Sequence, residues 1–163
     1  MADVGSMHRL ITYHAEHGRM LFRSHGELYE HIRDFLVADA DGQVVGCCAL
    51  ELVWRDLAEI KSLAVDESQR GAGIGRHLVT TALAEGRRLK LQRVFALTRE
   101  PGFFERLGFA VTPMESLPHK VWTDCVKCPV QDNCDEVAVA IDFEAGPERA
   151  DDRATEAIPA PPV

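Results

Sequence analysis

Three glycines at alternate positions, Gly71, Gly73 and Gly75, mark the stretch of this sequence that is best suited to bind a ligand. They follow an extended apolar run and precede a helical pattern, and Arg70 and Arg76 flank them. The backbone N–H groups at a helix start are unpaired and carry partial positive charge, and glycines let an anion come close to them. The loop is therefore predicted to cradle a phosphate. A plain strand-to-helix turn is the alternative, and the spacing fits neither a Walker A loop nor a dinucleotide fingerprint.

A carboxylate in the middle of a predicted strand is the second feature with chemical potential. Glu59 lies within AEIKSL, where a carboxylate is unexpected unless it faces a cleft. Period-two alternation places it on one face of the strand with Lys61, Leu63 and Val65. The alternative is a glutamate at a sheet edge, paired near Lys61 or with solvent.

The cysteines near the C-terminal end form a third candidate site. Cys125, Cys128 and Cys134 have the pattern C-x2-C-x5-C, and His119 lies six residues upstream. Three thiolates and an imidazole would suit tetrahedral zinc. Reduced, buried cysteines lining a loop are the favoured interpretation, because the spacing is tight and nothing fixes the geometry of the histidine. The other histidines lie on predicted helices or at their ends without a partner pattern.

The elements that must position these residues alternate between helical and extended patterns. A helix is predicted over residues 26–35, with Leu28, Ile32 and Phe35 on one stripe. Residues 35–52 read as two strands joined by a turn at Asp41–Gly42. Further along the chain we expect a strand over Leu57–Val65, a helix from Ile74 with Leu78, Val79, Ala82, Leu83 and Leu89 on one side, a strand over Arg93–Thr98, a short helix before Gly108 and a strand over Asp135–Phe143. This order predicts an α/β chain of the α+β type, a mixed and mostly antiparallel sheet with helices on both faces.

Composition restricts the class of protein further. The chain has 163 residues and a net charge of −8, which argues against a nucleic-acid partner, and no apolar stretch is long enough to cross a membrane. An odd count of five cysteines, with Cys47 and Cys48 in an apolar run, fits the reducing cytosol and hence a cytoplasmic protein. We expect one domain over residues 1–143 and a disordered, acidic, Pro/Ala-rich tail over residues 144–163.

The glycine loop and a second block together resemble a known family. QRGAGIG after SLAVDES, and FFERLGF at Phe103–Phe109, resemble the acetyl-CoA loop and the second block of the GNAT acetyltransferases, over about residues 3 to 143. The resemblance implies acetyl-CoA as co-substrate. Loop N–H groups would grip its pyrophosphate, and the backbone of three strand residues would pair with the pantetheine arm. The loop residues are Arg70, Gly71, Ala72, Gly73, Ile74, Gly75 and Arg76, and the strand residues are Leu63, Ala64 and Val65.

A narrower likeness connects four segments to the acetyltransferase domain of bacterial N-acetylglutamate synthases, in particular the single-domain form. The segments are MLFRSHGELYEHIRDFLV, DLAEIKSLAVDESQRGAGIG, RVFALTREPGFFERLGF and SLPHKVWTDCVKCPVQDNCDEVAV. By this resemblance the acceptor is L-glutamate, in arginine biosynthesis. Arg23 would hold a carboxylate of the acceptor, with backbone help from Leu21 and Ser62. Glu59 would be the general base, directly or through a water, and a backbone N–H near Leu63 would stabilise the oxyanion.

The sequence departs from these families in three respects. Phe104 stands where many GNAT enzymes have a tyrosine that protonates the leaving thiolate, so the thiolate leaves unprotonated or the acid comes from elsewhere. The family's first strand is expected to be absent, because the chain starts at a helix. The second carboxylate of glutamate has no assigned partner. Lys120 and Lys127 are candidates, although solvated lysines are the favoured interpretation.

Two alternatives to glutamate acetylation stay open. One is a GNAT acetyltransferase for another small amine or amino acid. The other is a non-catalytic module that binds acyl-CoA or senses metal, for which Phe104 and the cysteines are the arguments. A homodimer is compatible with the resemblance, since GNAT proteins often dimerise.

Overall fold

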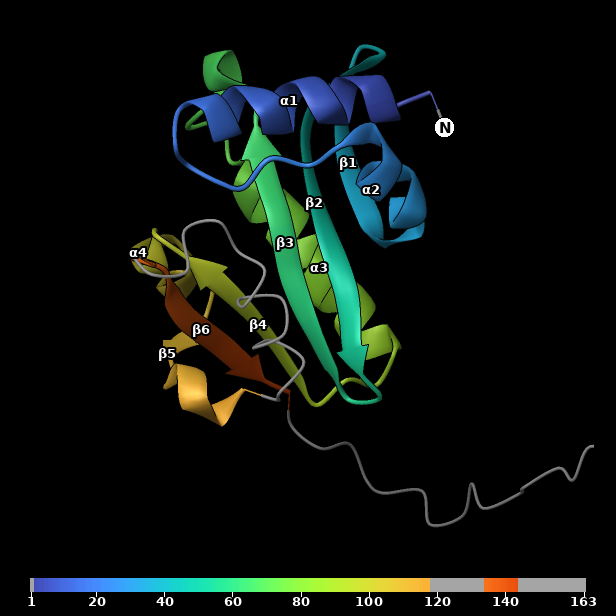
Figure 1. Ribbon diagram of the computed structural model, residues 1–163. Helices are drawn as coiled ribbons and strands as arrows, with labels where there is room; N and C mark the ends of the chain where they lie inside the picture. The colour runs from blue at the N-terminus through green and yellow to red at the C-terminus, as the bar shows by residue number, and fades with distance from the viewer. Residues whose placement is uncertain (1, 118–133, 144–163) are drawn as a thin grey trace, which may run out of the picture.

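The computed structural model describes residues 2–117 and 134–143. One sheet of six strands, in the order β1-β2-β3-β4-β6-β5, forms the middle layer (Figure 1). Some of the predictions concern residues outside these ranges and stay predictions. They are those for the tail and for His119, Lys120, Cys125, Lys127 and Cys128.

The strands confirm the predicted sheet. Every neighbouring pair is antiparallel except β3 and β4, which run parallel. The bounds are β1 Phe35–Ala40, β2 Gln43–Trp54, β3 Leu57–Val65, β4 Arg93–Thr98, β5 Ala110–Val111 and β6 Val137–Asp142. The expected turn between β1 and β2 is present. Asp41 has φ of 52° and Gly42 has φ of 80°, and a type I′ turn requires positive φ at both central residues.

Helices cover both faces of the sheet, as expected (Figure 1). On one face α1 (Val4–Glu16) and α2 (His25–Glu30) bury an apolar cluster against β2 and β3. On the other face α3 (Ile74–Arg88) and α4 (Pro101–Glu105) enclose the main core, in which Leu78, Val79, Ala82 and Leu83 of α3 are buried. Short 3₁₀ turns span Ile32–Asp34, Glu67–Gln69 and Met114–Ser116. Among residues 2–117, α1 precedes the first strand, as predicted.

The predicted helix over residues 26–35 is wrong in its extent. It starts at a capping box, in which the Ser24 hydroxyl accepts from the Glu27 N–H at 3.2 Å and Glu27 accepts from the Ser24 N–H at 2.7 Å. It ends at Glu30, because Phe35 pairs with Ala49 across the sheet and the backbone must be extended by then. The other two residues of the predicted stripe, Ile32 and Phe35, still pack in one cluster with Leu28.

Leu89 is the second correction among the helical residues. It is the C-cap residue of α3 and its side chain is 43% exposed, so it does not share the buried stripe. Leu91 is buried instead, and its N–H donates to the carbonyl of Gly86 at 3.0 Å. The helix therefore ends at Arg88, and the leucine that reaches the core comes after the helix.

In the described part of the chain no helix is long and apolar enough to cross a membrane.

Candidate acetyl-transfer site

The two parallel strands in the middle of the sheet separate after three residue pairs. Leu57, Ala58 and Glu59 of β3 pair with Arg93, Val94 and Phe95 of β4. β3 then continues for six residues to Val65 without a further pair to β4, and Figure 1 shows the two strands diverging. An exposed run of N–H and C=O groups on a strand edge accepts an added extended chain. The edge of β3 in this region includes Leu63, Ala64 and Val65, the residues predicted to meet the pantetheine arm.

A β-bulge lies in β3 at the point where the strands separate. Ser62 has φ of 52°, rare for a residue that is not glycine, and the register against β2 shifts between Cys47 and Ala49. The extra residue reverses which face later side chains occupy. Leu63 and Val65 accordingly pack with Ala58 and Ile60 in the core beneath α3. The prediction that Leu63 and Val65 share a face with Glu59 was therefore wrong.

The glycine loop has the backbone that an anion site requires. Gly71 and Gly73 have φ of 82° and 83°, and a Cβ at either position would meet no described atom within 4 Å. Gly73 is the N-cap of α3 and no side-chain hydrogen bond caps the helix start, so the first N–H groups of a 15-residue helix are left for a ligand. Gly75 differs, because a Cβ there would lie 3.6 Å from the Phe103 ring, in ordinary contact.

Charged side chains surround this loop. Arg70 donates to Glu67 at 3.0 Å, and Arg19, from the segment between α1 and α2, donates to the same carboxylate at 2.6 Å. These two hydrogen bonds lower the pKa of Glu67. Arg76 is exposed in the first turn of α3.

His14 is a residue that sequence reasoning missed. Its side chain is only 7% exposed, and Nε2 lies 2.7 Å from the carbonyl oxygen of Val65. Nδ1 lies 3.4 Å from an Arg19 guanidinium nitrogen, which can only donate. The Nε2–H tautomer therefore donates to Val65, at the strand end assigned to pantetheine. A histidine on a helical stripe carries no signal for such a partner, since the contact joins residues 51 positions apart.

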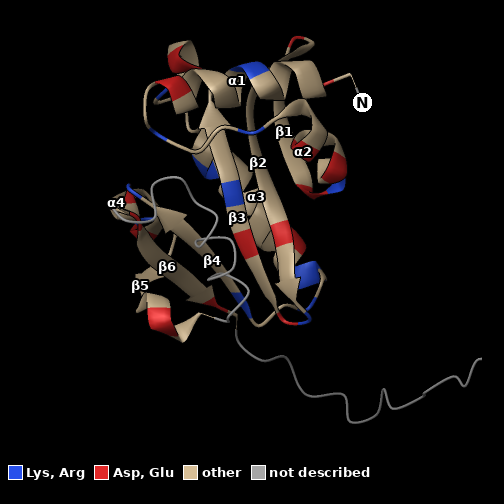
Figure 2. Cartoon of the chain, in the orientation of Figure 1, with Lys and Arg blue, Asp and Glu red and all other residues tan. Residues whose placement is uncertain are grey.

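Glu59 lies inside the protein, within an ion cluster. Its side chain is 8% exposed, and Oε2 lies 3.1 Å from the Nζ of Lys61. The same ammonium lies 3.2 Å from Oε1 of Glu51, which is directly opposite Glu59 on β2. Figure 2 shows this basic position and the two acidic positions together in the middle of β2 and β3. Sequence reasoning found Glu59 and Lys61 but missed Glu51, because the partner of a strand residue depends on register.

The segment between α1 and α2, which contains Leu21 and Arg23, crosses the C-terminal end of β3 (Figure 1). It is tied to the sheet at two points: Arg19 bonds Glu67, and an Arg99 guanidinium N–H donates to the carbonyl of Gly18. Arg99 follows β4, so the segment bridges the two diverging strands. Arg23 is partly exposed there, and Leu21 is 46% exposed.

Phe104 occupies a core position. It is 5% exposed, and its ring packs edge-on against Phe103 and Phe109 at centroid distances of 5.1 and 5.2 Å. The residue that stands at the family's tyrosine position thus contributes to packing and offers no proton.

Cys134 is the one member of the candidate zinc set within the described residues. It is exposed, so the interpretation of buried cysteines is wrong for this residue. No group of three or more His, Cys, Asp or Glu side chains in the described ranges is arranged to hold a metal ion. The other three candidate ligands, His119, Cys125 and Cys128, lie outside the described residues, so zinc binding by this set stays untested.

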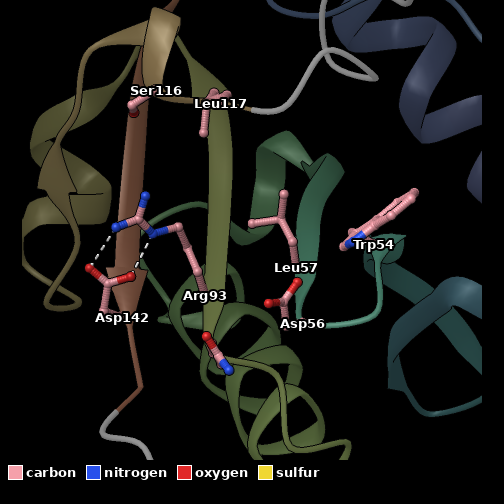
Figure 3. A pocket seen from close by; sticks show the side chains of 8 residues that line it. Trp54, Asp56, Leu57, Arg93, Ser116, Leu117 and Asp142 are labelled. Carbon is pink, nitrogen blue, oxygen red and sulfur yellow. Dashed lines mark hydrogen bonds and ion pairs between the residues drawn. The ribbon is translucent and has the colours of Figure 1, made fainter.

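A shallow pocket of ≈ 260 Å³ lies at the opposite end of β3 (Figure 3). Trp54, Leu57 and Leu117 line it, and Arg93 and Asp142 close one side with hydrogen bonds of 2.5 and 2.9 Å. Leu57 and Val65 lie eight residues apart on β3, about 26 Å along an extended strand. The pocket is therefore remote from the glycine loop.

These features define an acetyltransferase of the GNAT class, and the chain belongs to the acetyltransferase (GNAT) family, whose profile matches residues 6–109. It is an N-acetyltransferase that uses acetyl-CoA. The chain is 46% identical over 139 residues to an uncharacterized N-acetyltransferase of Chlorobaculum tepidum, covering 85% of this chain and 90% of the relative. It is 43% identical over 121 residues to the amino-acid acetyltransferase of Mycobacterium tuberculosis, covering 72% of this chain and 67% of that protein.

Two solved structures extend the comparison. A Mycobacterium tuberculosis protein in complex with CoA and a ligand designated NLQ aligns with a TM-score of 0.75 and 31% identity, covering 87% of this chain and 95% of that one. The N-acetylglutamate synthase of Neisseria gonorrhoeae, complexed with coenzyme A and N-acetyl-glutamate, aligns with a TM-score of 0.79 and 26% identity, covering 87% of this chain and 33% of that one.

Proposed function

We propose that this protein transfers the acetyl group of acetyl-CoA to the α-amino group of L-glutamate and so supplies N-acetylglutamate to arginine biosynthesis. Two relatives support the choice of acceptor: the Mycobacterium tuberculosis protein is named an amino-acid acetyltransferase, and the Neisseria gonorrhoeae synthase was solved with N-acetyl-glutamate. The observation that carries the proposal is the combination of a buried carboxylate, Glu59, with Arg23 on the segment that crosses the end of β3.

The coenzyme lies in the divergence of β3 and β4 in this proposal. Its pyrophosphate meets the N–H groups of residues 70–76 at the start of α3, and the arginines at positions 70 and 76 add positive charge. The pantetheine amides pair with the edge of β3 at residues 63–65. The thioester carbonyl then lies near the Leu63 N–H, which stabilises the oxyanion as the tetrahedral intermediate forms.

Glu59 is the general base in this mechanism. The amine of the acceptor must be neutral to attack the thioester carbon, and the nitrogen then carries a proton that must leave. The Glu59 carboxylate takes that proton directly or through one water. The C–S bond breaks and coenzyme A departs as the thiolate, which is a good leaving group at neutral pH because a thiolate is a weak base. The absence of a general acid at position 104, where Phe104 stands, is therefore compatible with the mechanism.

Arg23 holds a carboxylate of the acceptor, with the backbone of Leu21 and Ser62 beside it. A guanidinium binds a carboxylate through two parallel hydrogen bonds, which fixes orientation as well as charge. Ser62 lies at the β-bulge, where the regular ladder is interrupted, and in this proposal its backbone bonds the acceptor.

The test of this assignment is Arg23→Ala, with Arg33→Ala as the matched control. Arg33 is exposed in the neighbouring 3₁₀ turn. Losing a charge-assisted hydrogen bond costs about 1.5–3 kcal/mol, so KM for glutamate should rise roughly 10- to 100-fold in the Arg23 variant. The Kd for acetyl-CoA should not change in either variant. An unchanged KM for glutamate in Arg23→Ala would remove Arg23 from the acceptor site.

A further inference from the structure

Three charged side chains in the middle of the sheet form a cluster around Lys61. Its Nζ lies 3.1 Å from Glu59 Oε2 and 3.2 Å from Glu51 Oε1. The side chains of Lys61, Glu51 and Glu59 are 16%, 17% and 8% exposed. All three are therefore shielded from bulk water. Charge interactions between shielded groups are stronger than in water and less screened by salt.

The cluster follows from strand register. Glu51 and Glu59 are direct cross-strand partners, and side chains at such positions have Cβ atoms about 5 Å apart on one face. Two carboxylates so placed repel each other. Lys61, two residues beyond Glu59 on the same face, lies within ion-pair distance of both and offsets that repulsion. On the other side of Glu59 the register partner is Phe95 of β4, which carries no charge.

We propose that Glu51 and Lys61 are positioning residues that set the proton affinity and orientation of Glu59 during acetyl transfer. This inference rests on the role of Glu59 as base in the proposed function. Before transfer Lys61 is shared by two carboxylates. When Glu59 accepts the proton from the acetylated nitrogen it becomes neutral, and Lys61 stays protonated and paired with Glu51. The proton later leaves Glu59 for water, which restores the starting state.

The sharing of one ammonium between two carboxylates explains why both glutamates are useful. Lys61 alone beside Glu59 would favour the ionised carboxylate so strongly that it would be a poor base. Glu51 alone would favour protonated Glu59, which cannot accept a proton at neutral pH. Together they keep Glu59 ionised and still able to take a proton.

The two partners should shift the pH dependence of kcat/KM in opposite directions, which a merely structural role would not do. In Glu51→Gln one negative charge beside Glu59 is gone and Glu51 no longer competes with Glu59 for the Lys61 ammonium. The acidic limb of the profile therefore moves to lower pH and the maximal rate falls. In Lys61→Met the limb moves to higher pH. A shift of about one pH unit each way is expected for a charge within 4 to 6 Å. Lys61→Arg keeps the charge and should return the limb close to its wild-type position.

Matched controls remove one charge at exposed positions: Glu115→Gln and Lys90→Met. Both should leave the limb where it is. Shifts of the same sign in Glu51→Gln and Lys61→Met, or no shift in Glu51→Gln, would overturn the inference. If Lys61→Met does not fold, Glu51→Gln and Lys61→Arg still decide it.

Failure of the proposed function is read separately, from Glu59→Gln. A Glu59→Gln enzyme with full rate would show that Glu59 is not the base. If Glu59→Gln loses its rate while the pH profiles of the Glu51 and Lys61 variants do not shift, Glu59 keeps its role as the base. Only the positioning role of Glu51 and Lys61 is then rejected.

Discussion

Glu59 is the single residue on which the chemistry of the account depends. Its carboxylate is buried, is anchored by an ammonium and lies on the last residue pair before β3 and β4 separate. A carboxylate in that environment is costly unless it is paired and used. Its position in the strand could be predicted from the sequence, but its pairing could not, because the opposing residue on β2 lies in a different part of the chain.

Glu59→Gln should lower kcat by roughly 10²- to 10⁴-fold, because the amide is nearly isosteric and cannot accept the proton. The Kd for acetyl-CoA should remain at the wild-type value. Steady-state kinetics and coenzyme titration measure the two quantities, with Glu115→Gln as the control. A kcat within a few-fold of wild type would exclude Glu59 as the base.

The two adjacent core cysteines should be chemically inert. Burial raises the pKa of both Cys47 and Cys48 to about 12, so almost no thiolate exists below about pH 9. Cys134 is exposed. Alkylation of the native protein at about pH 8, where an exposed thiol is partly ionised, followed by mass spectrometry, should modify Cys134 well before Cys47 or Cys48. Equal rates at the three positions would contradict the buried arrangement of β2.

At the scale of elements, the strand β3, the glycine loop and helix α3 form one unit that could be predicted with little error. The strand bounds Leu57–Val65 agree with the prediction, and the loop and the start of α3 at Ile74 follow as expected. The error lies inside the strand, at Ser62. A bulge needs one residue with positive φ, and serine gives no sign of it, because the cost is met by tertiary pairing with β2.

The helix predicted over residues 26–35 fails for a related reason. Its apolar spacing is real, since Leu28, Ile32 and Phe35 lie in one cluster. The same spacing is satisfied by a short helix, a 3₁₀ turn and the first strand residue in succession. Helical period alone does not decide where a chain leaves the helix for a sheet.

Gly73→Leu should abolish coenzyme binding, and Gly42→Leu provides a matched control. Both glycines have φ near 80°, and a Cβ at either would meet no described atom within 4 Å, so both variants should lose about 1–2 kcal/mol of stability through backbone strain. Only Gly73 lies at the start of α3, where a side chain would occupy the anion site. Isothermal titration with coenzyme A should separate the two variants. Normal affinity in Gly73→Leu would contradict the phosphate cradle.

At the scale of the whole molecule, the protein carries a net charge of −8, although its co-substrate is an anion. The basic side chains near the glycine loop, Arg19, Arg70 and Arg76, make the local charge differ from the overall one. We expect the remaining acidic surface to act mainly through long-range repulsion, which salt screens.

The domain boundary proposed at residue 143 gives a prediction for truncated chains. The Phe143 N–H donates to the carbonyl of Gln92 at 2.7 Å, and Arg87 stacks over the Phe143 ring at 4.5 Å. Ending the chain after Phe143 should leave kcat and Tm unchanged. Ending it after Ile141 should lower Tm by at least about 3 °C, because these contacts are lost. Thermal melts of both truncations measure the effect, and a large loss in the first would show that residues 144–163 support the fold.

The most direct test of the account is the rate of coenzyme A release from acetyl-CoA with each of the twenty amino acids and a few polyamines as acceptors. We predict that L-glutamate gives the highest kcat/KM, and that this preference falls in Arg23→Ala. A higher kcat/KM for another amine, or binding of acetyl-CoA without turnover on any acceptor, would contradict the assignment of this protein as a glutamate acetyltransferase.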